Sequence, residues 1–114
     1  MNYTDRQRIK KIISTGNRLF EYLSKNEVTS EKVMNDYAIQ WTVTTPLYNI
    51  GEQTYNLSPE LKDRFPEIPW MKVSGMRHRL IHDYEGTNWS IIIDVLFQEL
   101  PLFIDQLREI SKLL

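Results

Sequence analysis

Apolar residues spaced three and four positions apart recur along most of this chain, and this spacing restricts the possible folds more than any other feature of the sequence. It places them on one face of an α-helix. Thr4 is a suitable N-cap and Lys25 and Asn26 offer a stop, so the pattern predicts a first helix over residues 4–25. Its apolar stripe consists of Ile9, Ile12, Ile13, Leu19, Phe20 and Leu23.

The same periodicity predicts a second, longer helix over about residues 30–56, with Thr29 or Ser30 as its N-cap. Pro46 lies inside this helix and should kink it, because proline lacks an N–H donor and its ring clashes with the preceding turn. The stripe expected to face the core consists of Val33, Met34, Tyr37, Ala38, Trp41, Leu47 or Tyr48, and Leu57.

The second half of the chain predicts three further helical segments. Ser58 followed by Pro59 indicates a short turn of helix that ends near Arg64. A third main helix is expected over residues 70–83, with Trp70 in the core, and a fourth over residues 89–113, bent at Pro101. The predicted fold class is therefore all-α, a bundle of four main helices in one domain over residues 1–114.

Composition excludes several classes of protein. The chain of 114 residues has no cysteine, which excludes disulfides, thiolate catalysis and cysteine zinc sites. No apolar run approaches the roughly 20 residues needed to span a bilayer, and the N-terminus lacks the apolar core of a signal peptide. We therefore expect a cytoplasmic protein with no membrane partner.

Charge is nearly balanced over the whole chain, at −1, but not along it. Residues 1–25 carry six basic and two acidic side chains. This excess indicates either a solvated helix face or a rim that faces the phosphates of a nucleic acid.

One stretch of eight residues, 77–84, holds two arginines, two histidines and a tyrosine, and these are the only histidines in the chain. His78 and His82 are four positions apart and share a helix face. A metal site needs further ligands, and neither a cysteine nor an H-E-x-x-H pattern supplies them. We expect neither a metal nor another cofactor here.

Arg77 and His82 suggest chemistry on RNA. They are five positions apart, about 140° around an ideal helix, so a second protomer is one way to bring them to the same substrate. Histidine transfers protons near neutral pH, and arginine presents a charged fork that fits a phosphate. Together they suit attack of a ribose 2′-hydroxyl on its neighbouring phosphate, which needs no metal. A solvated polar face is the alternative.

The spacing R-x-x-x-x-H-x-Y of Arg77, His82 and Tyr84, together with its flanking sequence, resembles the HepT-like family of HEPN domains. These are the toxins of toxin–antitoxin pairs in which the partner is a minimal nucleotidyltransferase (MNT). The matching flanks are Leu47-Tyr48-Asn49-Ile50-Gly51-Glu52, Leu57-Ser58-Pro59-Glu60-Leu61, Phe65-Pro66-Glu67-Ile68-Pro69-Trp70 and Gly75-Met76-Arg77.

The resemblance implies an up-down HEPN bundle of four to five helices with a kinked second helix, which forms a homodimer. It implies metal-independent cleavage of RNA by Arg77 and His82, with His78 and Arg79 as further candidates for binding the substrate. It also implies that a cognate minimal nucleotidyltransferase, the antitoxin, silences the toxin by adenylylating Tyr84.

The sequence departs from the family pattern in two places. Asp83 stands where glycine is common, and His78 where asparagine is common. A carboxylate close to His82 would raise the pKa of the imidazole and repel phosphate. The alternative function is therefore a non-catalytic binding module that serves as a modification substrate of the nucleotidyltransferase.

Overall fold

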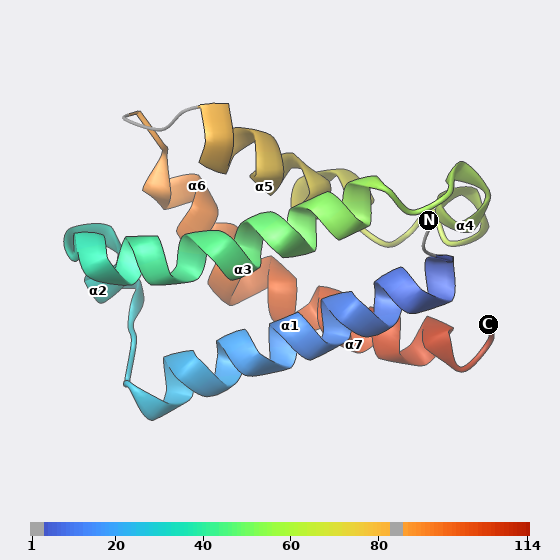
Figure 1. The fold of residues 1–114 in the computed structure, drawn as a ribbon, viewed down its shortest axis with the longest axis horizontal. Coiled ribbons are helices and arrows are strands. Elements are labelled where there is room, and N and C mark those ends of the chain that lie inside the picture. The colour runs from blue at the N-terminus through green and yellow to red at the C-terminus, as the bar shows by residue number, and fades with distance from the viewer. Residues whose placement is uncertain (1–3, 83–85) are drawn as a thin grey trace.

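A computed structural model of the chain describes residues 4–82 and 86–114, and every regular element in these residues is a helix (Figure 1). None of these helices has the length and hydropathy needed to cross a bilayer. The elements are α1 (Asp5–Lys25), α2 (Ser30–Asn35), α3 (Tyr37–Tyr55), α4 (Pro59–Arg64), α5 (Trp70–His82), α6 (Trp89–Asp94), a π-helical turn η1 (Val95–Glu99) and α7 (Leu100–Ser111). The all-α prediction is confirmed.

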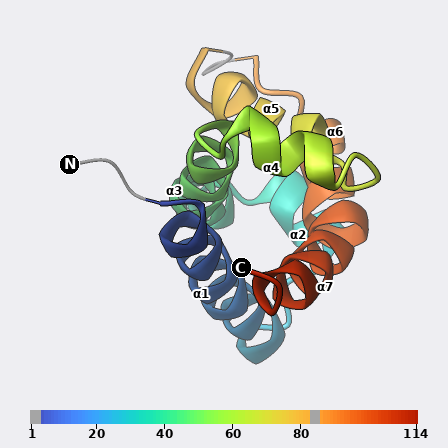
Figure 2. The same cartoon turned by 90° about the vertical axis from the view of Figure 1, so that its right-hand side faces the viewer.

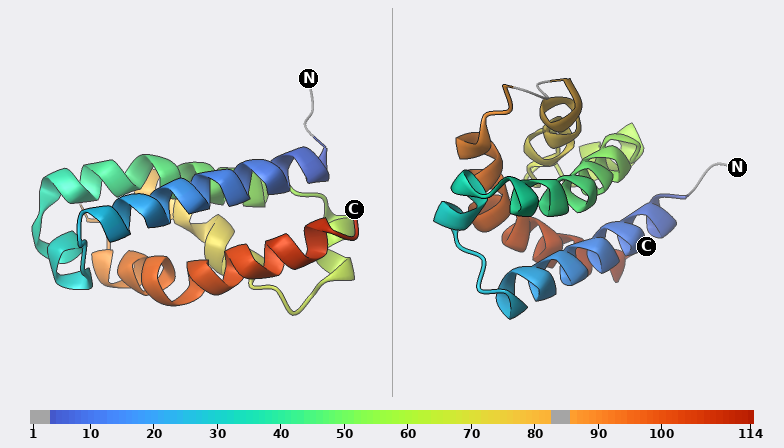
Figure 3. Two further views of the ribbon diagram at one scale, coloured as in Figure 1. Left: turned by 90° about the horizontal axis from the view of Figure 1, so that it is seen from below. Right: turned by 60° about the vertical axis from the view of Figure 1, so that its left-hand side comes forward.

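The long helices alternate in direction. Helices α1 and α7 run antiparallel side by side, as the left view of Figure 3 shows. Helix α3 packs on α1, and α5 packs on α3. Seen end-on in Figure 2, α1, α3, α5 and α7 are arranged around one core, to which α5 contributes Val73, Met76 and Leu80. The largest fully buried side chains of that core include Ile9, Ile12, Leu47, Ile50, Phe103, Ile104 and Leu107.

The start of α1 follows the prediction. Thr4 is the N-cap of a capping box in which Gln7 N donates to Thr4 Oγ1 at 3.1 Å and Thr4 N donates to Gln7 Oε1 at 2.8 Å. Asp5 ties this end to the start of α4, since Ser58 donates to its carboxylate from N at 2.9 Å and from Oγ at 2.5 Å. Ser58 is also the predicted N-cap of α4, with Pro59 as the first helical residue.

The predicted second helix is divided at Asp36, ten residues before the proline that was expected to kink it. Asp36 is extended, with φ −118° and ψ 108°, and its carboxylate accepts from the backbone N–H groups of Ala38 and Ile39. A strong N-cap therefore starts a new helix here. Pro46 lies within α3, which continues past it to Tyr55.

The break at Asp36 also corrects the predicted core stripe. Met34, Tyr37 and Trp41 are 44%, 66% and 66% exposed, so assigning them to the core was wrong. The buried residues of α3 are still three and four positions apart. Because a new helix begins after Asp36, they form a different face from the one predicted for a continuous helix. The buried face of α3 consists of Val43, Leu47, Ile50, Gly51 and Thr54.

The predicted fourth helix is interrupted by the π-helical turn η1, directly before α7. Pro101 occupies the first turn of α7. A proline inside a regular α-helix removes one hydrogen bond and clashes with the preceding turn. The predicted single helix over residues 89–113 is thus divided into α6, η1 and α7, with the wider turn directly before the helix that holds Pro101.

Candidate functional site

Helix α5 carries the motif and is fixed at its start by Trp70. This side chain is buried as predicted, its Nε1 donates to Phe65 O at 2.9 Å, and its ring meets that of Phe103 edge to face at 5.9 Å. Beyond Trp70 the helix buries one stripe of side chains. The motif side chains outside this stripe therefore lie on the other faces of α5. The buried stripe consists of Val73, Met76 and Leu80.

The motif lies on one uninterrupted helix as far as His82. Arg77 and His82 are therefore five positions apart on α5, about 140° around its axis. Asp83 and Tyr84 lie outside the described residues, as does the side chain of His82. The part of the candidate site that the structure describes is centred on Arg77.

Arg77 is held against α3 by an aromatic ring and a carboxylate. Its Cζ lies 3.6 Å from the centroid of the Tyr55 ring, within the range of a cation–π interaction. Its Nη1 lies 3.7 Å from Glu52 Oε2, and both of these side chains are half-buried. The guanidinium plane therefore has a defined position, which a solvated arginine lacks.

Glu52 is itself fixed by two neighbours on α3 and its C-cap. Tyr48 Oη donates to Glu52 Oε2 at 3.2 Å, and Asn56 Nδ2 donates to Oε1 at 3.0 Å. We call Arg77 and the four residues around it the Arg77 cluster. Its members are Tyr48, Glu52, Tyr55, Asn56 and Arg77. The 3.7 Å ion pair is longer than a hydrogen bond, so Arg77 keeps N–H donors for another acceptor such as a phosphate oxygen.

Gly51 sets the distance between α3 and α5 at the Arg77 cluster. A Cβ atom placed on Gly51 would lie 2.9 Å from Arg77 N and 3.2 Å from Val73 O, and both of these are backbone atoms. No side chain fits there without moving one of the helices. The absence of a side chain at Gly51 thus lets Arg77 reach Tyr55 and Glu52.

A second cation lies beside Tyr55. Lys62 Nζ donates to Tyr55 O at 3.1 Å and lies 6.0 Å from the ring centroid. Burial lowers the pKa of Lys62 below the usual value for lysine, and the negative charge of Asp5 opposes this shift in part. Two cations, Arg77 and Lys62, therefore lie near the ring of Tyr55.

The other two predicted binding residues follow Arg77 directly in the sequence and are more exposed than Arg77. His78 and Arg79 are exposed. Arg79 lines a groove between α5 and α6 with Met71 and Asp94, on another flank of α5. The structure thus brings Arg77 together with α3 and places Arg79 apart from it.

Two further features of the sequence bear on the site: possible metal ligands and the basic side chains of α1. Among the side chains that the structure describes, which do not include that of His82, no three or more of His, Cys, Asp or Glu are arranged to hold a metal ion. Helix α1 packs on α3 and α7, and its Arg8 is half-buried and donates from Nη1 to Gln53 Oε1 at 2.8 Å, whereas its other basic side chains are exposed. The exposed ones are Arg6, Lys10, Lys11, Arg18 and Lys25.

Sequence reasoning missed Tyr55 and Glu52 as neighbours of Arg77. A signal for them exists, because Tyr48, Glu52 and Tyr55 follow one another at spacings of four and three and so share a face of α3. Which helix packs on that face depends on the close approach of α3 and α5 at Gly51. The spacing of residues in the sequence does not reveal this approach.

The family model described as "Ribonuclease HepT-like" matches residues 6–110. The chain belongs to this family. A protein of Methanocaldococcus jannaschii named as a "Putative RNase" is 33% identical over 87 residues, which is 76% of this chain and 72% of the relative. A "Putative RNase" of Caldanaerobacter subterraneus is 32% identical over 75% of this chain and 76% of its own length.

A third relative, named "Probable ribonuclease HepT", comes from Thermococcus cleftensis and is 29% identical over 75% of this chain and 78% of its own length. No solved structure shows significant similarity to the chain. Family membership and the names of these relatives support an enzyme of the ribonuclease class.

Proposed function

We propose that this HepT-like chain is a metal-independent endoribonuclease toxin that cleaves RNA through Arg77 and His82, and that adenylylation of Tyr84 by a partner nucleotidyltransferase silences it. The observation that carries the proposal is the placement of Arg77. Its guanidinium is stacked on Tyr55 and faces Glu52 at 3.7 Å, on the same helix as His82. Membership of the ribonuclease HepT-like family supports RNA as the substrate.

The role of Arg77 follows from charge. As the 2′-oxygen of the ribose attacks, negative charge accumulates on the non-bridging oxygens of the phosphate. A planar guanidinium that is already oriented stabilises this charge without having to reorganise during the reaction. Tyr55 and Glu52 supply that orientation, so we assign them as positioning residues.

The role of His82 follows from proton balance. A bond forms between the 2′-oxygen and phosphorus while the bond from phosphorus to the 5′-oxygen breaks. The 2′-hydroxyl gives up its proton to a base, and the leaving 5′-oxygen receives one from an acid. An imidazole can serve in either step near neutral pH. The products are a 2′,3′-cyclic phosphate and a 5′-hydroxyl.

A homodimer is part of the proposal because one chain separates the two groups. Arg77 is directed to α3, and His82 is about 140° away around α5. Two facing copies of the motif would combine an arginine from one chain with a histidine from the other. Mixing the Arg77→Ala and His82→Ala variants tests this, since a site shared between chains regains activity in the mixed dimer and a site within one chain does not.

The main test is cleavage of RNA by the purified protein in EDTA. We expect 2′,3′-cyclic phosphate ends from the wild-type protein and no cleavage by the His82→Ala variant. Cleavage at an undiminished rate by folded His82→Ala protein would contradict the proposal, as would an absolute need for a metal ion.

A second candidate function is that of a binding module whose main role is to be modified by its nucleotidyltransferase partner. Two observations favour it: the net charge of −1 and the carboxylate of Asp83 next to His82. Co-expression with a neighbouring minimal nucleotidyltransferase followed by mass spectrometry tests the modification. An adenylyl adduct on Tyr84 supports the silencing step, and an unmodified Tyr84 contradicts it. Cleavage by the unmodified protein then separates a toxin from a binding module.

A further inference from the structure

A cavity of about 270 Å³ lies beside the motif, where α5 diverges from α3. In Figure 1 the C-terminal end of α5 rises away from α3, and α6 borders the gap that results. We call this the α3–α5–α6 cavity. Its lining residues are Gln40, Trp41, Thr44, Leu80, Thr87 and Trp89.

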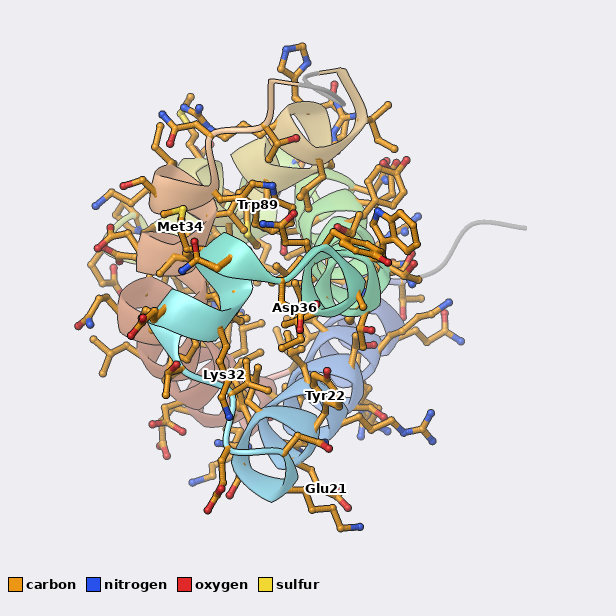
Figure 4. All side chains as sticks on the ribbon, turned by 90° about the vertical axis from the view of Figure 1, so that its left-hand side faces the viewer. Glu21, Tyr22, Lys32, Met34, Asp36 and Trp89 are labelled. Carbon is orange, nitrogen blue, oxygen red and sulfur yellow. The ribbon has the colours of Figure 1, made fainter. Side chains whose placement is uncertain are left out.

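Two indole rings from different helices line this cavity. Trp41 of α3 is 66% exposed, which is unusual for a tryptophan and marks it as a candidate contact residue. Tyr37, also exposed, packs its ring against Trp41 with centroids 4.8 Å apart and an angle of 65°, and so restricts the orientation of the indole. Trp89, labelled in Figure 4, comes from α6 and is half-buried.

The cavity also offers a hydrogen-bond acceptor. Gln40 Nε2 donates to Val33 O at 2.8 Å and to Met34 O at 3.1 Å, which uses both of its hydrogens. This fixes the amide, and among the described residues its Oε1 receives no hydrogen bond. Thr44 Oγ1 donates to Gln40 O at 2.6 Å, so the polar side of the cavity is held in place.

We infer that the α3–α5–α6 cavity binds one unpaired nucleobase of the RNA substrate, stacked on Trp41. This inference rests on the proposed function, because it assigns part of the RNA to a pocket next to the catalytic motif. Single-stranded RNA is recognised by aromatic side chains that stack on its bases and by polar groups that bond to their edges. The cavity combines both features.

The residues that line the cavity favour a nucleobase as its occupant over a phosphate or a ribose alone. None of the six lining residues is charged, whereas Arg77 lies three residues before Leu80 on α5. The expected RNA thus has a phosphate near Arg77 and, more than one nucleotide along the strand, a base in the uncharged cavity. Trp41 precedes Glu52 by 11 residues, about 16 Å along α3, so the two sites lie at opposite ends of the contact between α3 and α5.

The test measures RNA affinity in a protein that does not cleave. We would use fluorescence anisotropy of a short, labelled single-stranded RNA with the His82→Ala variant as the parent, and add Trp41→Ala, Trp41→Phe or Leu102→Ala. Leu102 is the matched control, because it is 65% exposed and lies on α7 away from the cavity. Loss of one stacking contact should weaken binding by roughly ten- to a hundredfold in Trp41→Ala. Trp41→Phe should retain most of the affinity and Leu102→Ala all of it.

An abasic residue in the RNA supplies a second readout. The abasic residue is placed at each position of the oligonucleotide in turn. At one position it should weaken binding to the parent protein but not weaken binding to the Trp41→Ala variant any further. Equal affinity of the Trp41→Ala variant and its parent would overturn the inference. So would a change of oligomeric state in Trp41→Ala with unchanged RNA affinity, since the cavity would then serve a protein interface. Failure of the parent itself to bind RNA would overturn the proposed function, and the inference with it.

Discussion

The two ends of the contact between α3 and α5 differ sharply. At one end Gly51 brings the two backbones together, and Arg77 lies pressed against Tyr55. At the other end the helices diverge and leave a cavity between Trp41 and Leu80. We call these the closed end and the open end.

This difference fits two needs of the proposed nuclease, an oriented arginine and an accessible pocket. A catalytic arginine has to be oriented before the substrate arrives, because reorganisation during the reaction reduces its effect. A base-binding pocket has to be empty and accessible. In the proposed enzyme, Gly51 at one end of the pair would meet the first need, and the divergence at the other end would meet the second.

The largest expected effect is removal of the arginine at the closed end. Arg77→Ala should raise the barrier to RNA cleavage by about 3 kcal/mol, because the charge on the phosphate is no longer stabilised. Arg64→Ala is the matched control, since Arg64 also lies over an aromatic ring, that of Phe65, at 5.2 Å. Single-turnover cleavage rates in EDTA provide the measurement. Similar rates for the two variants would show that Arg77 is not part of the catalytic site.

The next effect concerns the close approach itself. Gly51→Ala should lower the free energy of unfolding by about 1–3 kcal/mol, because the new methyl group meets backbone atoms of α5. Gly75→Ala is the control on the same helix pair, since a Cβ at Gly75 has no atom within 4 Å. There we expect a gain of up to about 1 kcal/mol from helix propensity. Urea unfolding distinguishes them, and equal stabilities would contradict the close packing at Gly51.

A smaller effect is expected at the ring beneath Arg77. Tyr55→Leu removes a cation–π contact worth about 0.5–2 kcal/mol and should slow cleavage by roughly tenfold. Tyr55→Phe keeps the ring and should restore the wild-type rate. The same loss in both variants would indicate that the hydroxyl, not the ring, matters. No loss in either would remove Tyr55 from the positioning residues.

The smallest effect is the pH dependence contributed by Lys62. Its pKa is lowered in the folded state, so between that lowered pKa and the usual lysine value the unfolded chain binds more protons. The free energy of unfolding should therefore rise with pH in this interval, and less so in Lys62→Met. The comparison is made by urea unfolding at a series of alkaline pH values. Identical pH profiles for the two proteins would show that burial does not shift this lysine.

Much of the fold could be predicted from the sequence, because helix signals are local. Thr4 caps α1 and Ser58 caps α4 as expected, and Trp70 is buried at the start of α5. The exposed position of Trp41 could not be predicted. Spacing identifies a face of a helix, but the cap at Asp36 begins a new helix and so changes which face is turned to the core.

The candidate site was also predictable only in part, because its motif is local in the sequence and its contacts between helices are not. The motif on α5 names Arg77 and His82 by their spacing, and the structure confirms that both lie on one helix. The contacts of Arg77 with Glu52 and Tyr55 depend on the distance between two helices. Tertiary packing decides that distance, through a single glycine.

The most direct test of this account is a crystal structure of the His82→Ala variant with a short single-stranded RNA. We predict a phosphate within hydrogen-bond distance of the Arg77 guanidinium at the closed end and an unpaired base against Trp41 at the open end. RNA bound along the basic face of α1, with Arg77 still turned only to Glu52 and Tyr55 and the cavity empty, would contradict it.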